Sequence, residues 1–73
     1  MSSNDVRIQF GKEVRAWRGR LGISQEELAD HAEINRNYVG MLEREEHAAT
    51  VDMLEKLANV LGVDPAELLR RSE

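Results

Sequence analysis

Residues 24–43 read SQEELADHAEINRNYVGMLE, and this stretch decides the fold. Ser24 stands three residues before Glu27. This is the spacing of a capping box, in which each side chain accepts a hydrogen bond from the other residue's backbone N–H. The box predicts a helix that runs to about His31, and Asn35, a favoured N-cap residue, predicts the start of the next helix. The inward-facing residues of this pair are expected to be Leu28, Ala29, Ala32, Val39 and Leu42.

A longer amphipathic segment precedes this pair of helices. Its apolar residues recur at the three- and four-residue spacing of one helical face. They are Phe10, Val14, Trp17 and Leu21, with Val6 one turn earlier. Gly22 follows directly and is expected to end the helix with a positive φ, a conformation that costs glycine little.

Two more helices are predicted after the pair. Thr50 is a favoured N-cap for an apolar-periodic helix of about 50–61. The sequence DPAE at 64–67 has the spacing of another capping box, with proline at the first helical position, and opens a helix of about 65–71. Residues 1–73 therefore predict a single compact all-α domain of five helices.

Composition excludes several classes of protein. The chain has 73 residues and no cysteine, so disulfides and thiolate metal sites are excluded. No export signal and no apolar run long enough to span a membrane are evident, so the cytoplasm is the expected compartment. The two histidines lack metal-ligand spacing and no nucleophile has a base at a suggestive spacing. We therefore expect no enzyme activity, no cofactor, no metal and no small-molecule ligand.

Charge is unevenly distributed along the chain. The net charge of -4 and the pI near 5.1 argue, taken alone, against a polyanionic partner. Between residues 7 and 20, however, five basic residues face one acidic residue, whereas residues 21–55 hold nine acidic residues against Arg36 and Arg44. The global charge is therefore a poor guide to the partner.

A combination of motifs along the chain narrows the family. The motifs are FG at 10–11, VR at 14–15, Arg18, GISQEELA at 22–29, YV at 38–39, LER at 42–44, and Leu54 followed by LANVLGV at 57–63. Together they resemble the lambda-repressor/Cro (XRE-like) helix-turn-helix regulators over about residues 8–69. The segment NRNYV at 35–39 further resembles controller proteins of restriction–modification systems. The resemblance implies a transcriptional regulator that places its helix of about 35–43 in the major groove of double-stranded DNA.

The resemblance also assigns residues to that DNA. Arg36 is the expected base reader, because its planar fork matches N7 and O6 of guanine. Asn37 would contact adenine or a phosphate, and Met41 offers only apolar contact. The expected contacts to the DNA backbone are Gln25, Asn35, Tyr38, Arg44 and Arg15, the last of which is equally compatible with a surface ion pair. Gln25 belongs to this set because it opens a helix whose N–H groups suit a phosphate oxygen.

Other residues are expected to hold the motif together. The family match implies a partly buried ion pair between Arg18 and Glu43, which would join the first helix to the end of the third. Ala29 and Gly40 are small where the two motif helices are expected to cross closely. Their expected role is packing.

The chain departs from the family pattern in two places. Glu33 occupies a turn position that is usually a glycine with positive φ, so either the residue is strained by roughly 1–2 kcal/mol or the turn is rearranged. Residues 45–49, EEHAA, replace a loop that is commonly basic. The loss of positive charge should weaken DNA binding and its salt dependence, or else select among partners.

One short recognition helix makes few contacts, so we expect a homodimer on a roughly palindromic operator. The expected interface residues are Val51, Met53, Val60, Leu68 and Leu69. An alternative is a protein-interaction module, such as an antitoxin-like partner binder, which the acidic balance favours. An RNA-binding or coactivator-type helical domain ranks last, because aromatic stacking platforms are lacking.

Overall fold

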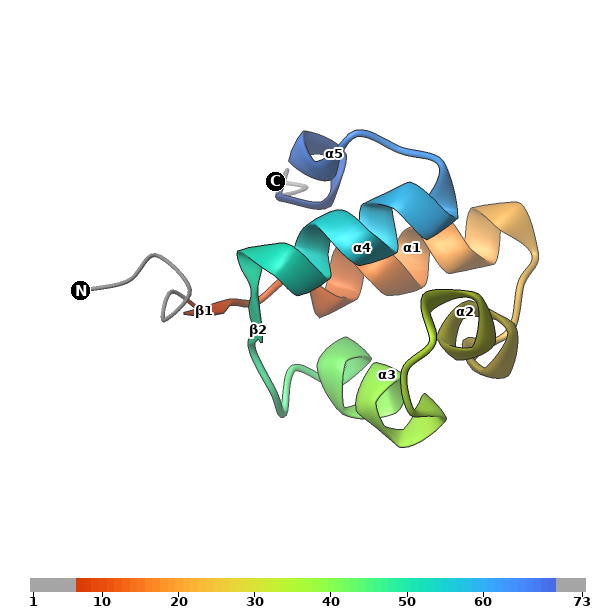
Figure 1. Ribbon diagram of the computed structural model, residues 1–73, viewed down its shortest axis with the longest axis horizontal. Helices are drawn as coiled ribbons and strands as arrows, with labels where there is room; N and C mark the ends of the chain where they lie inside the picture. Colours follow the sequence, from red (N-terminus) through yellow and green to blue (C-terminus); the bar gives the residue numbers. More distant parts are fainter. Residues whose placement is uncertain (1–6, 70–73) are drawn as a thin grey trace.

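The described residues form five helices and two short strands. The computed structural model describes residues 7–69 (Figure 1). In chain order its elements are β1 (Arg7–Ile8), α1 (Gly11–Leu21), α2 (Gln25–Ala32), α3 (Arg36–Glu43), β2 (Ala49–Thr50), α4 (Val51–Leu61) and α5 (Pro65–Leu69). The prediction of an all-α domain with five helices is thus confirmed over the described residues.

Side-chain caps and left-handed residues bound these helices. The Ser24–Glu27 capping box is present, with the Glu27 N–H donating to Ser24 Oγ at 3.0 Å and the Ser24 N–H donating to Glu27 Oε1 at 2.8 Å. The Met53 N–H donates to Thr50 Oγ1 at 3.3 Å at the start of α4. Gly22 follows α1 in the left-handed conformation, with φ 70°. The predicted boundaries of α1, α2 and α4 therefore rest on these contacts.

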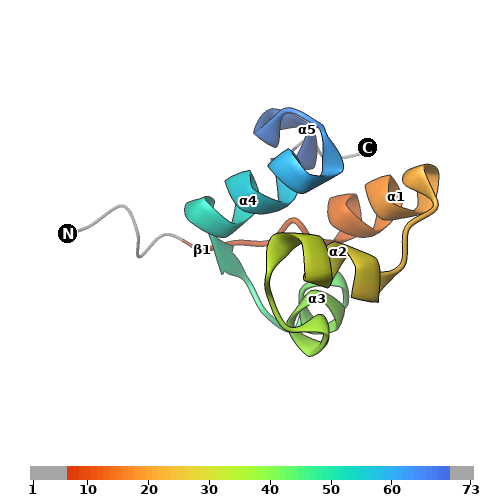
Figure 2. The ribbon, with the colours of Figure 1, turned by 45° about the vertical axis from the view of Figure 1, so that its right-hand side comes forward.

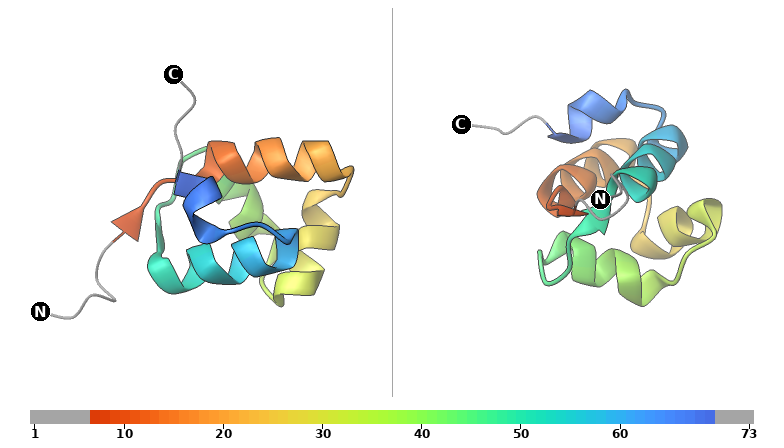
Figure 3. Two further views of the ribbon diagram at one scale, coloured as in Figure 1. Left: turned by 90° about the horizontal axis from the view of Figure 1, so that it is seen from above. Right: turned by 60° about the vertical axis from the view of Figure 1, so that its left-hand side comes forward.

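The helices are stacked in three levels. Helices α1 and α4 lie side by side in the middle, α5 covers them on one side, and α2 and α3 lie on the other (Figures 1 and 3). The largest fully buried side chains are Phe10, Val14, Leu28, Val39, Leu42, Leu57 and Leu68. They come from the middle level and from both sides of it, so one core joins all the helices. Helix α3 lies at the edge of the molecule away from α5 (Figure 2).

A two-residue antiparallel pairing, which we did not predict, joins β1 to β2. Arg7 pairs with Thr50 and Ile8 pairs with Ala49, whose side chain is fully buried. The chain is therefore extended at Arg7–Ile8, and the helix begins at Gly11. Val6, which we expected one helical turn before Phe10, lies outside the described residues.

Two expectations about apolar residues are wrong in detail. Leu21 was expected on the buried face of α1, but as the last residue of that helix it is 49% exposed. Leu68 was expected in a dimer interface, but it is 1% exposed and belongs to the core of the single chain. The neighbouring Leu69 is 45% exposed. Residues 70–71, the end expected for the last helix, lie outside the described residues. Within residues 7–69, no helix has the length and hydrophobicity that a membrane span requires.

Candidate nucleic-acid interface

Helix α3 presents one apolar side to the core and the opposite side to solvent. Val39 and Leu42 are fully buried, while Arg36 and Asn37 are exposed in its first turn. The Asn35 side chain caps the helix, since its Oδ1 accepts a hydrogen bond from the Asn37 N–H at 2.7 Å. The cap fixes where the helix begins, and thereby fixes which residues face outward.

The exposed side of α3 and the start of α2 enclose an open hollow of about 340 Å³. Its lining residues, which we call the α3 surface, are Gln25, Arg36, Asn37, Gly40, Met41 and Arg44. All three residues expected to contact bases are in this set, together with two of those expected to contact the backbone. Two guanidinium groups, two amides and one thioether thus share a single concave surface. Such groups can bind phosphate oxygens and the polar edges of bases.

Gly40 serves a different purpose from the one expected. A Cβ built on Gly40 would lie only 3.1 Å from Arg44 Nη1 and at an ordinary contact distance of 3.8 Å from Gln25 Oε1, so the missing side chain makes room for the Arg44 guanidinium. The close approach of backbones lies elsewhere: a Cβ on Gly11 would overlap the Leu42 carbonyl group. Glycine at position 11 therefore permits α1 to pack directly on the end of α3. Ala29, 3% exposed, is a packing residue as expected.

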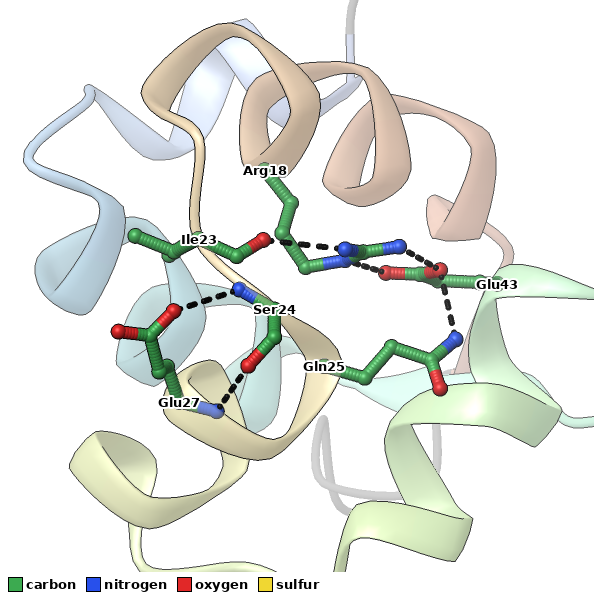
Figure 4. A network of polar contacts seen from close by, with 6 residues as sticks. All are labelled: Arg18, Ile23, Ser24, Gln25, Glu27 and Glu43. Atoms are coloured by element: carbon green, nitrogen blue, oxygen red, sulfur yellow. Dashed lines mark hydrogen bonds and ion pairs between the residues drawn. The ribbon is translucent and has the colours of Figure 1, made fainter.

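A network of polar side chains joins α1, α2 and α3 behind the α3 surface (Figure 4). Arg18 Nε donates to Glu43 Oε2 at 2.8 Å and Arg18 Nη2 donates to Glu43 Oε1 at 3.0 Å, so the implied ion pair is present and bidentate. Arg18 Nη1 also donates to the Ile23 carbonyl at 3.0 Å. Gln25 Nε2 donates to Glu43 Oε1 at 3.0 Å, which holds the amide at the rim of the hollow.

The ionisation of Glu43 is set by competing effects. Its side chain is 3% exposed, and burial alone raises the pKa of the carboxyl group. The hydrogen bonds from Arg18 and Gln25, with the positive charges of Arg18 and Arg15, more than offset this, so the pKa of Glu43 lies below its usual value. The same hydrogen bond to Glu43 raises the pKa of Arg18. Both groups are therefore charged at neutral pH. Arg15 is itself exposed.

The acidic loop after α3 contacts Arg44, a contact that we did not predict from the sequence. Arg44 Nε donates to Glu46 Oε2 at 2.9 Å and Arg44 Nη2 donates to Glu46 Oε1 at 3.2 Å. This hydrogen-bonded pair raises the pKa of Arg44 and lowers that of Glu46. The guanidinium expected to bind a phosphate therefore already has an anionic partner. A single residue, Glu45, separates Arg44 from Glu46, and this spacing predicts a contact only once the loop conformation is known.

Two further features concern the turns around α3. Glu33, which ends α2, adopts the left-handed conformation with φ 58°, so the strained turn, and not a rearranged one, is observed. Glu45 has φ 60° in the loop after α3.

The ring of His47 meets the ring of Tyr38 edge-on, with 5.2 Å between centroids. This contact places the loop histidine beside a residue that we expected to touch the DNA backbone.

Comparison with known proteins agrees with the fold. A family model described as helix-turn-helix matches residues 14–68. Control protein C.BamHI from Bacillus amyloliquefaciens is 37% identical over 68 residues, which cover 92% of this chain and 84% of that protein. The crystal structure of the restriction-modification controller protein C.AhdI from Aeromonas hydrophila is 38% identical, with a TM-score of 0.78, and the match covers 84% of this chain and 92% of that one.

This chain is also similar to a protein whose crystal structure contains DNA. The biofilm master regulator SinR, crystallised in complex with DNA, is 31% identical, with a TM-score of 0.79, and the match covers 84% of this chain and 98% of that one. The family model covers most of the chain, and the curated relative covers nearly all of it. The chain therefore belongs to the XRE-like helix-turn-helix family of DNA-binding transcriptional regulators, non-enzymatic proteins that include the controllers of restriction–modification systems.

Proposed function

We propose that this chain acts in the cytoplasm as a homodimeric controller of transcription that places the first turns of α3 in the major groove of a roughly palindromic operator. One observation carries the proposal: the expected base-contacting residues Arg36, Asn37 and Met41 line one open hollow on the exposed side of α3. The complex of the relative SinR with DNA supports the same use of this fold.

The geometry supports a role for each residue of the α3 surface. Arg36 extends from the first turn of α3 and is exposed, so its fork can reach N7 and O6 of guanine. Asn37 beside it can bind adenine or a phosphate, and half-buried Met41 can contact a thymine methyl group. Gln25, held by Glu43, retains its Oε1 and one N–H for the DNA backbone or a base. Asn35, Tyr38, Arg15 and Arg44 remain the proposed backbone contacts.

The proposed dimer uses the side of the molecule formed by α4 and α5. Val51, Met53 and Val60 on α4 are partly exposed, and Leu69 on α5 is 45% exposed. A small domain gains stability by burying such side chains against a second copy. Two α3 helices related by this contact would place half-sites about one helical turn of DNA apart.

The proposal is tested by the base contact of Arg36. Selection from random duplexes with the purified protein would yield a preferred sequence, and fluorescence anisotropy would then measure its affinity. Arg36→Ala should weaken binding by about 1–3 kcal/mol and relax the preference at one base pair in each half-site. Arg20→Ala, which removes one exposed positive charge from the last turn of α1, is the matched control and should change affinity little. Equal effects of the two substitutions would contradict the proposal.

A second candidate function is a protein-interaction module on the same fold. It is favoured by the acidic loop, in which Glu46 already occupies the guanidinium of Arg44. If this candidate is correct, retention on immobilised DNA at low salt should be weak and unaffected by Arg36→Ala. Loss of retention in that variant would instead support DNA binding as the function.

A further inference from the structure

Arg44 lines the α3 surface, and its side chain is 57% exposed to solvent. Its Nη1 lies 3.1 Å from the position that a Cβ on Gly40 would occupy, and both residues line the same hollow as Arg36 and Asn37. Because Gly40 has no side chain, the guanidinium can rest on the bare helix. Arg44 is thus positioned beside the groups proposed to contact DNA.

The backbone after α3 brings Glu46 to this guanidinium. Glu45 adopts φ 60°, and its N–H donates to the Leu42 carbonyl at 3.0 Å. The Glu46 N–H then donates to the Met41 carbonyl at 2.9 Å. These two bonds form a Schellman motif, which turns the chain back toward the helix. The carboxylate of Glu46 therefore meets Arg44 at a place fixed by the helix end.

The Glu46 carboxylate binds Arg44 as a phosphate would. Its two oxygens accept from Nε and Nη2 of Arg44 at 2.9 and 3.2 Å, a bidentate pairing of the kind that arginine also forms with phosphate. The same N–H groups cannot serve two anions at once. While the pair is intact, its two charges also cancel, so Arg44 adds no net positive charge to the α3 surface.

We infer that Glu46 competes with DNA phosphate for Arg44 and thereby lowers the affinity of the α3 surface for any duplex. This inference rests on the proposed function, because it requires DNA at that surface. A phosphate that displaces Glu46 gains a contact, and each phosphate neutralised steepens the dependence of log affinity on log salt by about 0.9. Glu46 thus sets a low background of sequence-independent binding, above which the base contacts of Arg36 and Asn37 distinguish the operator.

The test uses the full chain and a fluorescein-labelled duplex of about 30 base pairs with random sequence, titrated from about 50 to 200 mM NaCl. Glu46→Gln should tighten binding by about threefold or more at the low-salt end and steepen the salt slope by about 0.9. Glu45→Gln is the matched control, because it removes the adjacent charge without removing a hydrogen bond to Arg44. It should leave the slope unchanged. Both positions are at the surface, and circular dichroism would verify that each variant is folded.

A second pair of variants separates release of Arg44 from simple loss of negative charge. In an Arg44→Ala background, Glu46→Gln should have no effect on the slope. The inference is overturned if Glu46→Gln weakens binding, if Glu45→Gln has the same effect, or if the effect persists without Arg44. Wild-type binding that is lost on Arg36→Ala, with no response to Glu46→Gln, overturns this inference alone. Absence of duplex binding by every variant overturns both proposals.

Discussion

Glu33 is the clearest case of a residue whose type conflicts with its backbone. It ends α2 with φ 58°, and its N–H donates to the Asp30 carbonyl at 3.2 Å. A side chain in this conformation costs about 1–2 kcal/mol. The turn between α2 and α3 therefore carries local backbone strain.

Glu33→Gly should stabilise the domain by about 0.5–1 kcal/mol. The strain energy that the substitution removes is larger than the additional conformational entropy that glycine loses on folding, which costs about 0.5–1 kcal/mol. Urea unfolding followed by circular dichroism measures the difference. Glu33→Ala removes the same charge but keeps a Cβ, so it should bring no gain. An equal gain in both variants would assign the effect to charge and not to the backbone.

Single-residue roles were predictable where one local rule governs them. Ser24, Asn35 and Thr50 cap helices as their residue types indicate, since capping needs only neighbours in the chain. Gly11 was not recognised as a packing residue, because glycine is required there by the backbone of Leu42, which is far away in sequence. The Arg44–Glu46 pair was missed for a similar reason, since it depends on the left-handed Glu45 that turns the loop.

At the scale of elements, helices were predicted and the short strands were not. The helices carry periodic apolar residues and caps over eight or more residues in α1 to α4. The strands β1 and β2 have two residues each, too few to show an alternating pattern. The short length of α5 has the same consequence for Leu68 and Leu69. The sequence of a five-residue helix does not indicate which of two adjacent leucines faces inward.

The Arg18–Glu43–Gln25 network holds three helices in register, and its contribution should depend on pH. The pKa of Glu43 is lowered in the folded state, because the hydrogen bonds and charges outweigh its burial. A lowered folded-state pKa contributes stability above the pKa of the unfolded glutamate, and this stability is lost as the pH falls through the folded-state value. Acidification from neutral pH should therefore remove the contribution of the network.

Glu43→Gln tests this dependence. At neutral pH the variant should lose stability toward the lower end of about 3–5 kcal/mol, because Arg18 retains some contact with water when its partner is neutral. The gap between variant and wild type, measured by urea unfolding, should narrow steadily below the usual pKa range of glutamate. Glu55→Gln, at an exposed position of α4, should remain close to wild type at neutral pH. A gap that stays constant down to acid pH would show that Glu43 contributes packing and not charge.

At the scale of the whole molecule, two large exposed leucines differ in what they are expected to do. Among the described residues, Leu21 at the end of α1 is 49% exposed and Leu69 on α5 is 45% exposed. Of these two leucines, only Leu69 belongs to the proposed dimer contact, together with the partly exposed Val51, Met53 and Val60 of α4. The two positions therefore form a matched pair for testing the assembly.

Leu69→Glu should dissociate the proposed dimer, whereas Leu21→Glu should leave it intact. A buried carboxylate at the contact lacks a partner, so the dissociation constant should rise at least about tenfold, equivalent to 1.4 kcal/mol. Sedimentation velocity at tens of micromolar measures the change, and circular dichroism verifies that both variants are folded. Operator binding should weaken with Leu69→Glu alone, because a monomer contacts one half-site. A wild-type chain that is monomeric at this concentration and stays so on DNA would contradict the dimer, as would equal dissociation by both substitutions.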